Sequence, residues 1–217
     1  MSEILESATV AGRLIEEESF RLIERELGAH SFSLAEWQVV RRVIHATADL
    51  EFARALVFSP GAVQAGAEAL RRGSAIVCDV QMVAAGLSRE RLAAFGCDVA
   101  CFVGDDDVAL AARAANSTRA AEAMHKAERL GLLGGAVVAI GNAPTALTAL
   151  ARLMRDEAAR PALVLGVPVG FVNAVEAKEA ALALPAARII ARGRKGGSSV
   201  AAAIVNALLV LAAEDPS

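Results

Sequence analysis

Short β-rich runs alternate with helical segments along most of the chain, and this alternation restricts the fold more than any other feature. An uninterrupted apolar run such as Val137–Ile140 suits a parallel sheet that is covered on both faces. We predict strands at 54–58, 74–79, 98–103, 136–141, 162–167 and 188–192, and helices at 62–70, 80–95 (broken near Gly86), 108–130, 145–155, 174–183 and 198–213. The βαβα order predicts an α/β fold: a doubly wound, mostly parallel sheet with helices on both faces, in a flavodoxin-like three-layer arrangement.

Two helices precede the first strand, so a helical arm is expected before the sheet. The first is predicted at 9–27, where Ser19 is the polar member of an apolar stripe. Its hydroxyl either bonds back to the helix backbone or faces a polar ligand. Ser33 with Glu36 forms a capping box that opens the second helix. With no repeat or linker visible, residues 1–217 are predicted to form a single domain.

Composition excludes several classes of function. The net charge of −3 and the absence of Tyr, with seven Phe and one Trp, argue against a nucleic-acid partner. No apolar run is long enough to span a membrane, and the first residues lack the order of a signal peptide, so we expect a cytoplasmic protein. Three cysteines suit a reducing compartment. Cys97 and Cys101 are predicted to share one face of a strand as buried thiols rather than metal ligands, because no second pair completes a zinc site.

The second helix carries a candidate proton-handling residue. Arg41, His45 and Asp49 are four residues apart, which would place the imidazole between a cation and a carboxylate on one helix face. Histidine titrates near neutral pH, so this arrangement suits acid–base work. The alternative is an ordinary surface or core histidine. His30 and His125 have no comparable setting and are interpreted as surface residues.

Three glycine-containing loops follow strands at the edge where ligands bind in such folds. They are 141–147, 166–172 and 193–199, and in the last Arg194 and Lys195 add positive charge for an anionic ligand beside a helix start. Glycine allows close approach to a ligand, and helix starts bind anions, although ordinary turns and caps are the alternative. Neither a Walker A motif nor G-x-G-x-x-G is present, which disfavours a standard nucleotide site.

Two further stretches carry charge near predicted helix starts. Ser117 or Thr118 is expected to cap a helix, with Arg119 in its first turn, where an anionic ligand would stabilise the cation; a solvated surface Arg is the alternative. The run Asp105–Asp107 resembles a helix cap more than a metal site.

As a set, these stretches resemble the precorrin-8X methylmutase family. The most specific blocks are 141–147 and 168–172. The others are Ser19-Phe20, 43–46, 58–60, Cys78-Asp79, 82–84, Thr118-Arg119, Gly166, Gly193-Arg194 and 196–198. One departure follows Val172, where Asn173 and Ala177 stand in place of the Gly and Ser expected from the family.

The resemblance implies an isomerase that moves a methyl group from C11 to C12 of a late corrinoid, giving hydrogenobyrinic acid, or cobyrinic acid when cobalt is present. It implies that His45 handles the proton, that Ser19 and Arg119 line the tetrapyrrole pocket, and that the protein is a homodimer without a separate cofactor or metal. Hand-over of product to a neighbouring pathway enzyme is a further expectation. The remaining substrate-binding candidates come from the loops: Asn142, Thr145, Gly193, Arg194, Gly196, Gly197 and Ser198.

The residues suit this chemistry. Helix starts and cations suit the many carboxylates of a corrinoid, and a positioned His could protonate the conjugated ring and promote migration. Two other hypotheses remain open at this point. One is a corrinoid carrier without catalysis; the other is a receiver-type signalling module, suggested by Asp79, 105–107 and Lys195. The receiver is disfavoured because its acidic pair should follow the first strand, where Phe58–Pro60 stands.

Overall fold

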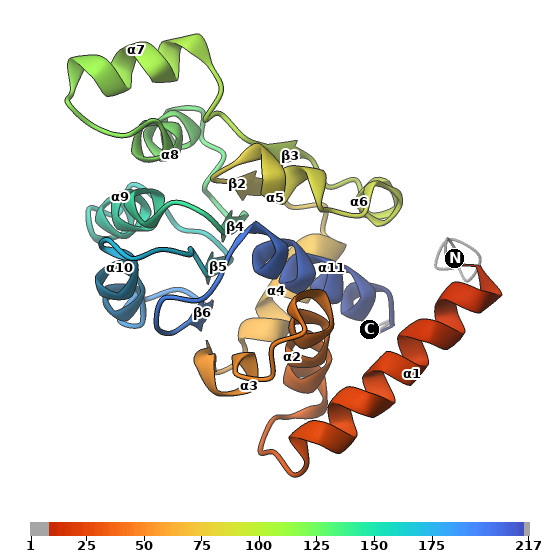
Figure 1. Ribbon diagram of the computed structural model, residues 1–217. Helices are drawn as coiled ribbons and strands as arrows, with labels where there is room; N and C mark the ends of the chain where they lie inside the picture. The colour runs from red at the N-terminus through yellow and green to blue at the C-terminus, as the bar shows by residue number, and fades with distance from the viewer. Residues whose placement is uncertain (1–8, 215–217) are drawn as a thin grey trace.

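The computed structural model describes residues 9–214 as a six-stranded sheet between two helical layers (Figure 1). The strand order is β1-β6-β5-β4-β2-β3, in which β1 runs antiparallel to β6 and every other pair is parallel. The strands are β1 (Leu56–Phe58), β2 (Ile76–Cys78), β3 (Val99–Ala100), β4 (Val137–Ile140), β5 (Leu163–Gly166) and β6 (Arg188–Ala191). The predicted mostly parallel α/β sheet is confirmed.

The five parallel strands have the order of a flavodoxin-like sheet. Numbered among themselves, β2 to β6 read 2-1-3-4-5 from β3 across to β6. The strand order reverses between β2 and β4, which is the topological switch point of such a fold. Folds of this kind bind their ligands at this point by default.

Helices cover both faces of the sheet. They are α1 (Val10–Leu27), α2 (Leu34–Thr47), α3 (Phe52–Ala55), α4 (Ala62–Arg71), α5 (Gln81–Ala85), α6 (Arg89–Phe95), α7 (Asp106–Ala114), α8 (Arg119–Arg129), α9 (Pro144–Arg155), α10 (Ala174–Ala181) and α11 (Ser198–Glu214). Alternate strand residues face opposite layers, as a pleated strand requires. Val137 and Ala139 pack with α2, α4 and α11, whereas Val138 and Ile140 pack with α8, α9 and α10.

The helical arm is confirmed. Thr9 caps α1, and Ser33 and Glu36 form the predicted capping box of α2. Helix α1 packs along α2 and extends away from the sheet (Figure 1). No residue of α1 is buried.

Several predicted boundaries are wrong. The single helix at 108–130 is two helices, because Asn116 adopts a left-handed conformation (φ 48°) between them. Arg54 and Ala55 belong to the short helix α3 rather than to a strand. Strand β3 is two residues long, so Cys97 and Cys101 flank it instead of sharing its face. Cys97 is nevertheless buried, and its Sγ lies 3.2 Å from the Leu70 carbonyl oxygen.

Among residues 9–214, no helix has both the length and the apolar character needed to cross a bilayer. The first residues, on which the signal-peptide argument depends, lie outside the described part of the chain.

Candidate active site

His45 lies on the last turn of α2 and is held by α1. The Ser19 Oγ lies 2.9 Å from the His45 Nδ1, so the helical arm supplies the hydrogen-bond partner of the imidazole. Phe20 packs its ring against the same imidazole in an edge-on contact, with the ring centroids 5.5 Å apart. Of the two interpretations of Ser19, the structure therefore shows a side chain directed at another functional group rather than bonded back to its own helix.

The predicted row of Arg41, His45 and Asp49 is wrong at Asp49, whereas Arg41 and His45 do lie four residues apart on α2. Arg41 pairs with Glu24 at 2.9 Å and stacks over the Phe20 ring instead of facing the imidazole. Asp49 is not on the helix, because α2 ends at Thr47 and Ala48 adopts a left-handed conformation. Asp49 pairs with Lys195, whose ammonium holds the pKa of that carboxyl below its usual range. Helical spacing predicted the row, and the end of the helix breaks it.

A cavity of about 190 Å³ opens beside the imidazole. Its walls come from α1, the end of α2 and the turn that follows, and His45 itself is exposed. The lining is largely apolar, with Ser19, His45 and Glu26 as its polar members; the other residues are Leu22, Ile23, Ile44, Ala48 and Leu50.

The second and third glycine loops are joined into one unit. The Gly170 N–H donates to the Arg194 carbonyl at 3.2 Å, and the Gly197 N–H donates to the Val167 carbonyl at 2.9 Å. Gly196 is required here, because a Cβ at this position would lie 2.2 Å from the Val167 oxygen. The glycine prediction at these loops is thus explained by backbone packing between them.

Lys178 connects the same two loops through their backbone carbonyl groups. Its side chain is fully buried, and its Nζ donates to the carbonyls of Pro168 and Lys195, each at 2.9 Å. Burial lowers the pKa of Lys178 to about 8. Sequence reasoning missed this role of Lys178. The one signal for it is a lysine on a helix face whose other residues are small and apolar.

The first glycine loop is already occupied by a side chain of the protein. Asp79 is fully buried just after β2. Its carboxylate accepts hydrogen bonds from the backbone N–H groups of Gly141 (2.9 Å), Asn142 (2.8 Å) and Ala143 (2.6 Å). Burial raises the pKa of Asp79, while these hydrogen bonds act in the opposite direction. Three of the N–H groups that the sequence predicted to be free for a ligand are therefore bound to the Asp79 carboxylate at the switch point.

Arg119 and Thr145 lie on the opposite helical layer from His45. Of the two residues predicted to cap this helix, Ser117 and Thr118, it is Thr118 that forms the N-cap of α8. Its hydroxyl lies 2.8 Å from that of Thr145. These threonines line a cavity of about 620 Å³ between α8, α9 and α10, while Arg119 lines a neighbouring one of about 430 Å³. His125 is half-buried and lines the larger cavity, whereas His30 is exposed and stacks on Trp37.

Exposed apolar side chains follow two of the parallel strands. Met82 comes after β2, and Val169, Phe171 and Val172 come after β5, with Phe171 being 84% exposed. The Arg194 guanidinium lies 5.4 Å from the centre of the Phe171 ring. Asn142 is exposed at the same edge, whereas Ser198 is buried at the start of α11. This edge therefore combines apolar surface with cations.

Comparison with known proteins decides the family. The family model described as "Precorrin-8X methylmutase" matches residues 14–211. The chain belongs to the precorrin-8X methylmutase family.

Relatives of this family match almost the whole chain. A cobalt-precorrin-8 methylmutase of Leptospira interrogans is 48% identical, covering 95% of this chain and 96% of the relative. A precorrin-8X methylmutase of a Sinorhizobium species is 45% identical, covering 91% and 93%. The solved precorrin-8X methylmutase of Thermus thermophilus superposes with a TM-score of 0.85 at 50% identity, covering 92% of this chain and 98% of that one.

Membership of the precorrin-8X methylmutase family confirms the predicted class, an isomerase of corrinoid biosynthesis. The comparisons give no support to a carrier or to a receiver module. Asp79, which suggested the receiver, caps the neighbouring loop instead. Asp105 is the N-cap residue of α7 but makes no capping hydrogen bond with its side chain. Asp105 and Asp107 instead pair with Lys126 at 2.7 Å each.

Proposed function

We propose that this chain moves a methyl group from C11 to C12 of precorrin-8X or cobalt-precorrin-8, with His45 as the proton donor. One observation carries the assignment of the donor: the Ser19 hydroxyl bonds the His45 Nδ1 at the edge of a cavity that both side chains line. Family membership supports the assigned methyl transfer, and this contact supports His45 as the proton donor.

The hydrogen bond defines how His45 would act. A protonated imidazole donates from both ring nitrogens, so the Nδ1–H would donate to the Ser19 oxygen and the Nε2–H would remain for transfer. After transfer the neutral ring keeps the Nδ1–H bond to Ser19, which holds one tautomer. Protonating the conjugated substrate makes a ring carbon electron-poor, so the methyl group leaves C11 with its bonding electron pair and forms a bond to C12. Because substrate and product are isomers, the migrated intermediate then returns a proton to the Nε2 of His45.

The remaining predicted residues would bind the macrocycle and its carboxylates. Phe171 and Val172 offer exposed apolar surface, and Arg194 adds a cation beside it. Arg119, at the start of α8, is a second candidate for a carboxylate. Within the glycine loops, we assign contacts to the side chain of Asn142, to Thr145, and to the backbone of Gly193, Gly196 and Ser198. Gly197 instead shapes the loop, because its N–H already donates to the Val167 carbonyl.

We also propose a homodimer that works in the cytoplasm as one domain and passes product to a neighbouring enzyme. The dimer has support in the exposed apolar residues of α1, and the reducing compartment has support in three free cysteines. Both metal-free and cobalt-containing substrates are represented among the relatives, a precorrin-8X methylmutase and a cobalt-precorrin-8 methylmutase.

The test is an absorption spectrum of the purified protein mixed with precorrin-8X and followed over time. Turnover converts an interrupted conjugated system into a continuous corrin chromophore. His45→Ala should slow conversion by at least about 10²-fold, the contribution of one positioned acid. Ser19→Ala should slow it by about 10-fold, because the ring loses its partner but keeps its proton. Both variants should bind product within about 3-fold of the wild type, since neither residue is assigned to a carboxylate.

His30→Ala is the matched control, because it removes another exposed histidine away from the cavity. Its turnover should equal that of the wild type. Conversion by His45→Ala at the wild-type rate would move the proton donor to another residue. Binding of the substrate by the wild type without any conversion would refute the methylmutase assignment.

A further inference from the structure

The backbone changes direction abruptly just after His45. Ala48, three residues after His45, caps α2 in a left-handed backbone conformation (φ 52°, ψ 31°), which residues other than glycine seldom adopt. The next turn is fixed by Asp49, whose Oδ1 accepts the Glu51 N–H at 2.9 Å. A strained cap persists only where its surroundings hold it in place. The contacts that hold this turn therefore bear on the position of His45.

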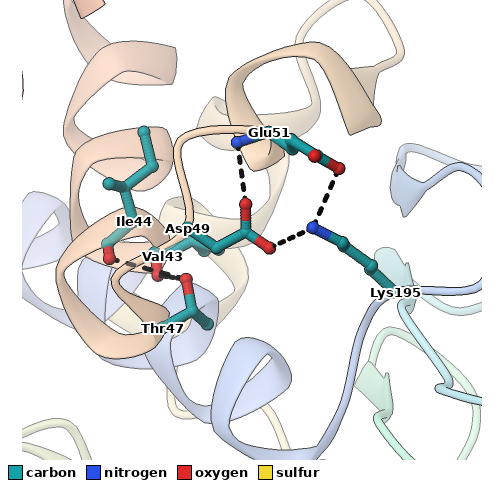
Figure 2. Close-up of polar contacts among 6 residues, drawn as sticks. All are labelled: Val43, Ile44, Thr47, Asp49, Glu51 and Lys195. Atoms are coloured by element: carbon teal, nitrogen blue, oxygen red, sulfur yellow. Dashed lines mark hydrogen bonds and ion pairs between the residues drawn. The ribbon is translucent and has the colours of Figure 1, made fainter. Parts of the chain in front are cut away.

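Lys195 supplies the long-range contact to this turn. Its ammonium lies 2.6 Å from the Asp49 Oδ2 and 2.8 Å from the Glu51 Oε2, as Figure 2 shows. The pairing joins residues 146 positions apart in the chain. It connects the loop at 193–197 to the end of the helix that carries His45.

Lys195 is also fixed at its backbone. Its carbonyl accepts a hydrogen bond from the buried Lys178, which anchors the Pro168 carbonyl as well. The ammonium of Lys195 thus extends from an anchored loop to a strained turn. An exposed ion pair contributes little to folding, so a role in holding geometry accounts for this arrangement better than a role in stability.

We propose that Lys195 is a positioning residue that locks the end of α2, and with it His45, to the glycine loops at the sheet edge. The sequence suggested that Lys195 adds charge for an anionic ligand; its ammonium instead meets two carboxylates of the protein. The inference rests on the proposed function, since it assigns Lys195 to holding the proton donor of that reaction.

Lys195, Asp49 and Glu51 form an ion triad, and the chain contains a matched control for it. Lys126 likewise pairs with two carboxylates, those of Asp105 and Asp107, on the layer of helices opposite α2. Lys126→Met removes the same chemistry away from His45. Its turnover should equal that of the wild type.

Lys195→Met and Asp49→Asn should each lower kcat by about 10-fold, because misplacing a catalytic group by a fraction of an ångström is costly. Product affinity should stay within about 3-fold, since neither residue is assigned to the ligand. The double variant should be no slower than Lys195→Met alone, as expected of two ends of one contact. Lys195→Arg should restore most of kcat by keeping the cation.

A structural readout separates this inference from the proposed reaction. The ring signals of His45 in an NMR spectrum should shift in Lys195→Met and Asp49→Asn, and stay unchanged in Lys126→Met, with His30 as an internal reference. This result is expected whether or not precorrin-8X is converted. If Lys195→Met weakens substrate binding while Asp49→Asn does not, Lys195 binds a substrate carboxylate and the positioning role is refuted. Unchanged His45 signals in both variants would refute it as well.

Discussion

A single buried carboxylate, that of Asp79, occupies backbone N–H groups that could otherwise bind a substrate. Asp79 takes the N–H groups of Gly141, Asn142 and Ala143, at the switch point where this fold binds ligands by default. The helix start after β4 therefore already has its anion. After β4, substrate contacts are left to the side chains of Asn142 and Thr145. The loops after β5 and β6 and the start of α8 supply the other contacts, which is why the candidate site extends away from the switch point.

Replacing Asp79 with Asn should lower the free energy of unfolding by roughly 2–4 kcal/mol, because the amide group turns an acceptor into a donor facing backbone N–H groups. Urea unfolding followed by circular dichroism measures the change. Asp98→Asn is the matched control, since Asp98 is exposed and its variant should stay within about 0.5 kcal/mol of the wild type. Equal stability of Asp79→Asn and wild type would contradict the capping role.

At the scale of elements, two loops and one helix form a connected support for the site. Lys178 on α10 holds the carbonyls of Pro168 and Lys195, and hydrogen bonds between the loops complete the unit. At the start of α10, Asn173 adopts a left-handed conformation (φ 58°). Asn tolerates this conformation better than most residues, so it can replace the Gly expected from the family without rebuilding the loop.

The buried Lys178 predicts a pH dependence of stability. Its pKa is about 8 in the folded protein and near its ordinary 10.5 when unfolded. Below about pH 8 both states hold the proton, so the difference from a Lys178→Met variant is constant. Between pH 8 and pH 10.5 the unfolded state binds more protons, so the free energy of unfolding of the wild type, relative to Lys178→Met, should rise by roughly 1–3 kcal/mol.

Denaturant unfolding of both proteins at several pH values tests this expectation. The difference between the wild type and Lys126→Met should not rise over the same interval, because its carboxylate partners raise rather than lower the pKa of Lys126. A flat difference for Lys178→Met would show that Lys178 titrates as it does in water.

At the scale of the whole molecule, α1 is the least covered element. Val10, Leu14 and Ile15 are 65%, 58% and 70% exposed, although they begin the helix that supplies Ser19 to His45. An exposed apolar stripe of this kind is typical of a subunit interface. A second copy that covers α1 would also hold Ser19 in place, which ties the proposed dimer to activity.

A double variant, Leu14→Glu with Ile15→Glu, should raise the dissociation constant of the dimer by at least about 100-fold, because two unpaired charges would be buried. Sedimentation velocity over a range of concentrations measures it. Leu130→Glu is the control, an exposed leucine (55%) beyond the end of α8, and should leave the dimer intact. A monomeric wild type, or a double variant that remains dimeric, would rule out α1 as the interface.

The sequence by itself determined the elements and the family. Apolar runs such as Val137–Ile140 and caps such as Ser33 are local signals, so the sheet class and most helices could be predicted from neighbouring residues. The break after Thr47 could not be predicted, because a left-handed alanine leaves little trace in composition. At Asn116 the cap expected at Ser117 or Thr118 indicated the new helix start, although the periodicity predicted one helix over 108–130.

Only the tertiary structure decided which side chains meet. His45 bonds Ser19, 26 residues away, rather than the Arg41 and Asp49 that helical spacing placed beside it. Asp79 occupies the loop after β4, and Lys195 joins the turn after α2, through contacts between segments far apart in the chain. Hydrogen bonds and ion pairs act over about 3 Å, so they depend on how the layers pack, and spacing along one helix or strand carries no record of that packing.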